Sequence, residues 1–156
     1  MTTKTQLQNK IQELEAELQE FKQQLGSYKD TPTLQEARVG DTLEDGSIVL
    51  SKENGLALLV APESTEVRAT WSQEFTKVFN KLQDQGFNPS QWFVPTVEQL
   101  KLAYKTIPGE FSTALYWSST EVSSTDACFQ DFNNGIISSF SKTSPYCVRA
   151  FRCVTY

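Results

Sequence analysis

The sequence contains no histidine, so the side chain that most often serves as a general base or a metal ligand is missing. Cysteine is scarce too: Cys128, Cys147 and Cys153 all fall in the last third of the chain, without a Cys-x-x-Cys spacing. An odd number of thiols excludes a fully paired disulfide framework within one chain. We expect buried free thiols, which are common in protein cores, with a Cys128–Cys147 cross-strand disulfide as the alternative.

Positive charge and long apolar runs are also lacking. The 14 Lys and Arg are outnumbered by 19 Asp and Glu, whereas a surface that binds nucleic acid needs clustered cations for phosphate contacts. No stretch approaches a membrane span, and the first ten residues, MTTKTQLQNK, lack the apolar core of a signal peptide. We therefore expect no nucleic-acid partner, no membrane insertion and folding in the cytosol.

What the sequence does contain is enough for one modest domain and an appendage. The chain has 156 residues, of which 38% are hydrophobic and 12% aromatic, so an aromatic-rich core can form. We divide it into an N-terminal helix over 1–28, a polar linker over 29–38 and a globular domain over 39–156.

The N-terminal helix is predicted to form a coiled coil, because its apolar residues recur at alternating spacings of four and three. They are Leu7, Ile11, Leu14, Leu18, Phe21, Leu25 and Tyr28. In this register the g–e pairs between neighbouring chains, Lys10–Glu15 and Glu17–Lys22, are opposite in charge, which favours parallel strands. The expected product is a parallel homo-oligomer. A trimer is preferred, although the a and d residues leave a dimer open.

Two helices are expected in the globular domain. The first covers 71–85, with Thr70 and Gln73 as a capping box. Its apolar residues fall on one face: Trp71, Phe75, Val78, Phe79 and Leu82. The second covers 97–106 and opens with Thr96 at its N-cap.

Strands are expected on either side of these helices. Two lie near 42–50 and 56–61, and a last strand covers 146–154. Asn134-Gly135 predicts a hairpin with a two-residue type I′ turn, because both residue types tolerate positive φ. Helices followed by strands, with early and final strands both present, indicate an α+β fold with a mainly antiparallel sheet.

The serines in YWSSTE are not expected to be nucleophiles. Ser118 and Ser119 have no histidine to activate them and no Gly-x-Ser-x-Gly context, and a Ser–Lys pair is the weaker alternative. We expect Tyr116 and Trp117 to anchor a core strand while the serines satisfy backbone groups. No enzymatic activity is predicted.

Two arginines stand near the end of the chain. Arg149 and Arg152 would point to opposite faces of a single strand. They could clamp an anionic ligand, but we expect an internal pair with Glu98 or Asp131.

The order of several segments resembles the Lcl C-terminal domain family, which is found in bacterial surface proteins and tailed phages. The segments are GLALLVAP (55–62), Trp71, WFVPTVEQL (92–100), YWSSTE (116–121), DFNNG (131–135) and VRAFR (148–152). The resemblance implies a C-type-lectin-like fold with two helices and irregular loops that present a ligand-binding surface. The Glu-Pro-Asn and Trp-Asn-Asp signatures of calcium-dependent animal lectins are absent, so no metal or other cofactor is expected.

The candidate ligand-binding residues lie in or beside the polar loops 119–126 and 138–145, which are rich in Ser and Thr. They are Glu121, Ser123, Ser124, Asp126, Asn133, Asn134, Lys142 and Ser144.

These features predict a non-enzymatic binding module of a tailed-phage virion, either a fibre or a receptor-binding protein. The N-terminal helix would assemble the chains and attach them to other virion proteins, while the lectin-like domains contact a host surface glycan or protein. A structural capsid or tail decoration protein is one alternative. An adhesin on a bacterial cell surface is the other.

Overall fold

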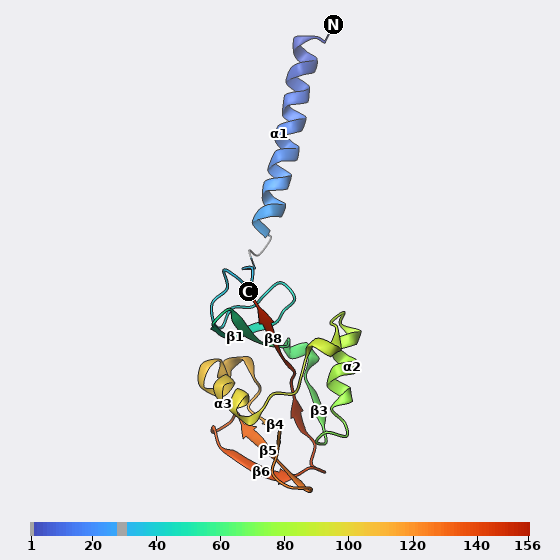
Figure 1. The fold of residues 1–156 in the computed structure, drawn as a ribbon. Helices are drawn as coiled ribbons and strands as arrows, with labels where there is room; N and C mark the ends of the chain where they lie inside the picture. The colour runs from blue at the N-terminus through green and yellow to red at the C-terminus, as the bar shows by residue number, and fades with distance from the viewer. Residues whose placement is uncertain (1, 28–30) are drawn as a thin grey trace. The chain divides into compact units, whose positions relative to one another are not determined.

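The structure, a computed structural model, describes residues 2–27 and 31–156 (Figure 1). The chain divides into two units, Met1–Thr31 and Pro32–Tyr156. Within the described residues the first unit contains the helix α1, and the second contains α2, α3 and the strands β1 to β8. The seam position predicted at Tyr28 lies outside the described residues.

The helix α1 covers Lys4–Ser27, in agreement with the predicted N-terminal helix. Its start is closed by two reciprocal hydrogen bonds. The N–H of Thr3 donates to Oε1 of Gln6 at 2.9 Å, and the N–H of Gln6 donates to Oγ1 of Thr3 at 3.3 Å. This capping box satisfies backbone donors that a helix otherwise leaves unpaired.

The strands of the second unit form two sheets. One has the order β1-β2-β8, with bounds Ile48–Glu53, Leu56–Val60 and Phe151–Thr155. The other has the order β3-β7-β4-β5-β6, with bounds Val67–Ala69, Tyr146–Val148, Leu115–Glu121, Asp126–Asp131 and Ile137–Ser141. Only β4 and β7 pair in parallel. The helices α2 (Thr76–Asp84) and α3 (Val97–Thr106) lie on opposite sides of the unit (Figure 1). The fold is mixed α+β, as expected, with two sheets rather than one.

The first expected strand is shorter than predicted. The strand β1 starts at Ile48, and Thr42 reaches it only through an isolated bridge. Between them the chain turns, because Gly46 has a φ of 87° and Oδ1 of Asp45 accepts a hydrogen bond from the N–H of Ser47 at 2.9 Å. A side chain that bonds the backbone two residues ahead favours a turn over a strand.

The two-residue turn predicted at Asn134-Gly135 is wrong, although the hairpin itself, β5 to β6, is present. Of these two residues only Gly135 has a positive φ, of 81°. The connection is longer, with the N–H of Asp131 donating to O of Ile136 at 2.8 Å. A Cβ on Gly135 would lie 2.6 Å from the ring of Tyr104, so the turn packs tightly against α3.

The two-residue turn occurs instead at the other Asn-Gly pair. Asn54 and Gly55 have φ values of 52° and 76° and join β1 to β2, with Glu53 opposite Leu56. Positive φ at both turn residues is the type I′ requirement.

The first predicted helix is also shorter, because α2 begins at Thr76 rather than at Trp71. The proposed capping box is wrong. The N–H of Thr70 donates to the Glu74 carboxylate at 2.8 Å, and Ser72 has a φ of 63°. A helix cannot run through a residue in the left-handed region. By contrast, the start of α3 is confirmed, since Thr96 and Gln99 form both hydrogen bonds of a capping box.

The expected final strand is divided between the two sheets. It breaks at Arg149 and Ala150, so that β7 belongs to the five-stranded sheet and β8 to the three-stranded one. The N–H of Ala61 donates to O of Ala150 at 2.9 Å, which ties this crossing to the end of β2. The two arginines therefore do not share a strand. The predicted pairing with Glu98 or Asp131 is wrong as well, because Arg149 contacts Ala61 and Glu66 instead.

Arg149 is held inside the fold at this crossing, with 0% of its side chain exposed. Its Nε donates to O of Ala61 at 2.8 Å, and its Nη1 donates to O of Glu110 and lies 4.0 Å from the carboxylate of Glu66. Burial lowers the pKa of Arg149, an effect that the Glu66 carboxylate opposes. The same carboxylate accepts the hydroxyl of Tyr116 at 2.7 Å. One buried cation thus joins the segments after β2, before β3 and before β4.

The aromatic pair in β4 anchors the core as predicted, since both Tyr116 and Trp117 are fully buried. Ser118 satisfies the backbone, also as predicted. Its Oγ donates to O of Cys128 at 2.7 Å and accepts from the N–H of Thr120 at 3.1 Å.

All three cysteines are free thiols, so the Cys128–Cys147 disulfide is wrong. Cys128 lies on β5 and Cys147 on β7, and β4 runs between these strands. The prediction that the thiols are buried holds for Cys147, whereas Cys153 is exposed.

This difference predicts selective thiol chemistry. We expect iodoacetamide at pH 8 to alkylate Cys153 in the native protein and to leave Cys147 unmodified. Only 7% of Cys147 is exposed, and burial, aided by Glu66, raises the pKa of its thiol to about 11, so little reactive thiolate forms. Peptide mass spectrometry would measure the modification, with a urea-unfolded sample as the control. Equal labelling of both thiols in the native protein would contradict the expectation.

Candidate functional site

The predicted polar loops meet at a hollow of about 500 Å³ that also includes the segment before α2. We call it the Trp71 groove, and it is lined by residues 70–73, 124–125 and 141–143. The β4–β5 loop and the β6–β7 loop contribute one wall each. The groove therefore gathers segments that are far apart in the sequence.

Lys142 is at the centre of this groove. Its Nζ lies 2.8 Å from Oε1 of Glu121 and 3.2 Å from O of Ser124, and 4.4 Å from the centroid of the Trp71 ring. Its backbone N–H donates to O of Thr125 at 2.8 Å, and its carbonyl accepts from the N–H of Trp71 at 3.0 Å. Only 17% of its side chain is exposed, and its ammonium lies beside an acid and an aromatic ring.

Trp71 supplies the aromatic surface of the groove. Its Nε1 donates to O of Ser118 at 2.7 Å, which fixes the indole against β4. The next residue, Ser72, takes the left-handed conformation with a φ of 63°. Such a backbone costs a non-glycine residue on the order of 1 kcal/mol, and strained residues cluster at binding sites. The sequence analysis did not predict this role, because the helical spacing placed Trp71 on the apolar face of the expected helix 71–85.

The predicted ligand residues fall into three sets. Glu121, Ser124 and Lys142 come together at the groove, through the contacts given above. Ser123, Asp126 and Ser144 instead hold the loops. The Oγ of Ser123 accepts from the N–H of Asp126 at 3.0 Å, and O of Ser144 accepts from the indole of Trp117 at 3.0 Å.

The third set lies away from the groove. Asn133 and Asn134 are exposed in the turn from β5 to β6, at the opposite end of β5 from Ser123 and Ser124. The Oδ1 of Asn134 accepts from the N–H of Ile136 at 2.9 Å. The Asn134 amide thus shapes the turn, which packs on Tyr104, and neither asparagine lines the groove.

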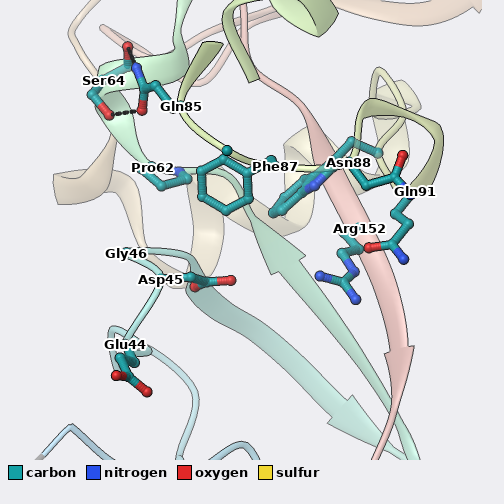
Figure 2. A pocket seen from close by; sticks show the side chains of 12 residues that line it. Glu44, Asp45, Gly46, Pro62, Ser64, Gln85, Phe87, Asn88, Gln91 and Arg152 are labelled. Atoms are coloured by element: carbon teal, nitrogen blue, oxygen red, sulfur yellow. Dashed lines mark hydrogen bonds between the residues drawn. The ribbon is translucent and has the colours of Figure 1, made fainter. Parts of the chain in front are cut away.

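A second hollow, of about 720 Å³, is formed by residues that the sequence analysis did not predict to bind a ligand (Figure 2). We call it the Arg152 cavity. Its lining comes from the turn at 44–46, the segment 85–92 after α2, and β8. Asp-Gly at 45–46 and Gly-Phe-Asn-Pro at 86–89 are local turn signals. They do not predict that the segments 44–46 and 85–92 face each other.

The chain matches no protein-family model, and no curated protein shows significant similarity to it. Among residues 2–27 and 31–156, no helix is long and apolar enough to cross a membrane. In the same ranges, no three Cys, Asp or Glu side chains gather as ligands for a metal ion.

Proposed function

We propose that the protein is a non-enzymatic binding module that assembles through α1 and presents several copies of its second unit to a host surface glycan or protein. The observation that carries this proposal is the exposed apolar seam of α1. Its members are 52% to 74% exposed. They are Leu7, Ile11, Leu14, Leu18, Phe21 and Leu25.

An uncovered seam of this kind favours self-association. Burying one exposed leucine stabilises an assembly by roughly 1.5–3 kcal/mol, and a helix of this length is marginal when it is alone in water. Other copies of the same chain fit as the partner, because the g and e charges on parallel neighbours are complementary. A parallel coiled-coil trimer is the assembly that we propose.

The lectin-like assignment of the second unit belongs to the same proposal. It is supported by the order of segments that resembles the Lcl C-terminal domain family, and by the mixed α+β fold with mainly antiparallel strands. In that reading, the Trp71 groove is the ligand-binding surface, since loops on a rigid scaffold commonly carry binding residues. An aromatic ring, an ammonium and several hydroxyls suit a polar ligand such as a glycan or a protein loop.

The biological setting that we propose is a tailed-phage virion, in which the protein is a fibre or receptor-binding component attached to other virion proteins through α1. Several weak sites on one oligomer bind a repetitive cell surface far more strongly than any one of them does. Assembly through the seam of α1 would therefore strengthen the binding of a cell surface by the groove of the second unit.

The groove can be tested with Lys142→Gln. We expect this variant to bind host envelope fractions about tenfold more weakly or worse, because the loss at each site is multiplied across the oligomer. Lys105→Gln, an exposed site on α3, is the matched control and should bind like the original protein. Sedimentation with envelope fractions and glycan arrays would measure the binding.

Two results would count against the proposal. If the oligomer binds no envelope fraction or glycan at micromolar concentrations, a decoration protein that merely packs on the virion becomes the better hypothesis. If Lys142→Gln binds as well as the original protein, the groove is not the binding surface.

A further inference from the structure

We infer that the Arg152 cavity is a second binding site, for a zwitterionic group that carries a methylated ammonium next to a phosphate, as phosphocholine does. The proposed function rests on the seam and the Trp71 groove, so this site goes beyond it. The cavity brings together one free cation, two acids and two aromatic rings.

The cation is the guanidinium of Arg152 on β8. It lies over the ring of Trp92, with Cζ 5.8 Å from the centroid. Among the described residues it takes part in none of the ion pairs closer than 4.0 Å. Arg149, only three residues earlier, is bonded inside the fold. A guanidinium is always charged and presents paired donors that match a phosphate, so Arg152 is free to bind one.

A nearly buried indole ring lines the same cavity. Trp92 is only 5% exposed, and its indole N–H has no hydrogen-bond partner within the part of the chain that the structure describes. A buried donor without an acceptor is unfavourable. Because this N–H is buried below the cavity surface, Trp92 contributes to the site through the ring face over which the guanidinium lies.

The opposite wall suits a cation. Asp45 and Glu44 both line the cavity, and Figure 2 shows the Asp45 carboxylate and the Arg152 guanidinium pointing toward each other across the opening. Asp45 is held in place, since its Oδ1 accepts from both the N–H and the hydroxyl of Ser47. The ring of Phe87 also lines the cavity (Figure 2). A methylated ammonium has no N–H to donate, and it binds through aromatic faces and nearby negative charge.

The two walls together select against simpler ligands. A plain anion would pair with Arg152 but would be repelled by two carboxylates, whereas a plain cation would leave the guanidinium unpaired. A zwitterion satisfies both walls. The volume of about 720 Å³ is within the usual range for small-ligand sites, which is roughly 300–1,000 Å³.

Calorimetry on the full chain with phosphocholine tests this assignment. We expect saturable binding, with choline alone and inorganic phosphate alone each at least about tenfold weaker, because each keeps only one of the two charged contacts. Arg152→Gln should weaken phosphocholine binding by a similar factor and leave choline binding unchanged. Asp45→Asn, which keeps an acceptor for Ser47, should weaken choline and phosphocholine together.

Vesicles of phosphatidylcholine separate the possible sources of the group. Binding to vesicles as well as to soluble phosphocholine would assign a lipid headgroup, and binding to the soluble form alone would assign another phosphocholine carrier; either supports the site. Absence of binding at millimolar phosphocholine, equal affinity for inorganic phosphate, or an unchanged affinity in Arg152→Gln would each overturn it.

Lys142→Gln is the matched control for this experiment, because it alters the Trp71 groove and not the cavity. It should bind phosphocholine like the original protein. Failure of the phosphocholine site would therefore leave the envelope-binding test of the groove unaffected, and the reverse also holds. Circular dichroism of each variant would show that the second unit remains folded.

Discussion

Replacing Leu14 and Leu18 with aspartate is expected to convert the oligomer that we propose into folded monomers. Both residues belong to the apolar seam. In the single chain Leu14 is 52% exposed and Leu18 is 54% exposed. In the assembled coil, two carboxylates per chain would be buried without partners, and each unpaired buried charge costs several kcal/mol. Analytical ultracentrifugation should then report a single chain of 17.6 kDa.

The matched control places the same two charges outside the seam. Gln12→Asp with Gln19→Asp adds equal charge at b positions, which face solvent in a coiled coil, so this variant should stay oligomeric. Near-ultraviolet circular dichroism would confirm that the second unit is intact in both. An oligomer that survives in the Leu14 and Leu18 variant would mean that the second unit holds the assembly and that α1 is accessory.

Replacing Arg149 with methionine is expected to lower the free energy of unfolding by about 3–5 kcal/mol, the usual cost of removing one partner from a buried charged pair. Methionine has a similar length, so most of the packing is kept while the charge is lost. The carbonyls of Ala61 and Glu110 then lose a donor, and the carboxylate of Glu66 loses its cation. Urea unfolding followed by tryptophan fluorescence would measure the change.

Arg152→Met is the control for this second prediction, since it removes the same type of side chain from a partly exposed position that forms no ion pair with any described residue. We expect it to change the unfolding free energy by less than about 1 kcal/mol. Combining Arg149→Met with Glu66→Gln should cost less than the sum of the two changes, because each removes the same interaction. A loss below about 1 kcal/mol in Arg149→Met would show that Arg149 does not hold the two sheets together.

Local signals in the sequence predicted those parts of the fold whose partners are close in the chain. The heptad spacing predicted α1, and Thr96 with Gln99 predicted the start of α3, because a capping box needs only residues three apart. The aromatic pair Tyr116 and Trp117 correctly indicated a core strand. Each of these inferences depends on chemistry within one or two turns of a helix or within a single strand.

The two Asn-Gly pairs show where local information ends. The same dipeptide forms the two-residue turn at Asn54-Gly55 but not at Asn134-Gly135. At the second pair, Tyr104 of α3 lies against Gly135 and the turn is longer. The type of turn therefore depends on Tyr104, a residue about thirty positions away in the sequence. The sequence of the hairpin alone does not contain this information.

Tertiary structure likewise decided the candidate sites. The polar loops were predicted as binding surface, but only the fold brings Trp71 over Lys142 and separates Asn133 from both. The split of the last strand between two sheets sends Arg149 inward, toward carbonyls and a carboxylate from distant segments. It leaves Arg152 facing the turn at 44–46 (Figure 2). Helix and cap formation follow from short-range hydrogen bonds and spacing, whereas burial, ion pairing and cavities depend on which distant segments pack together, and that is settled only when the whole chain folds.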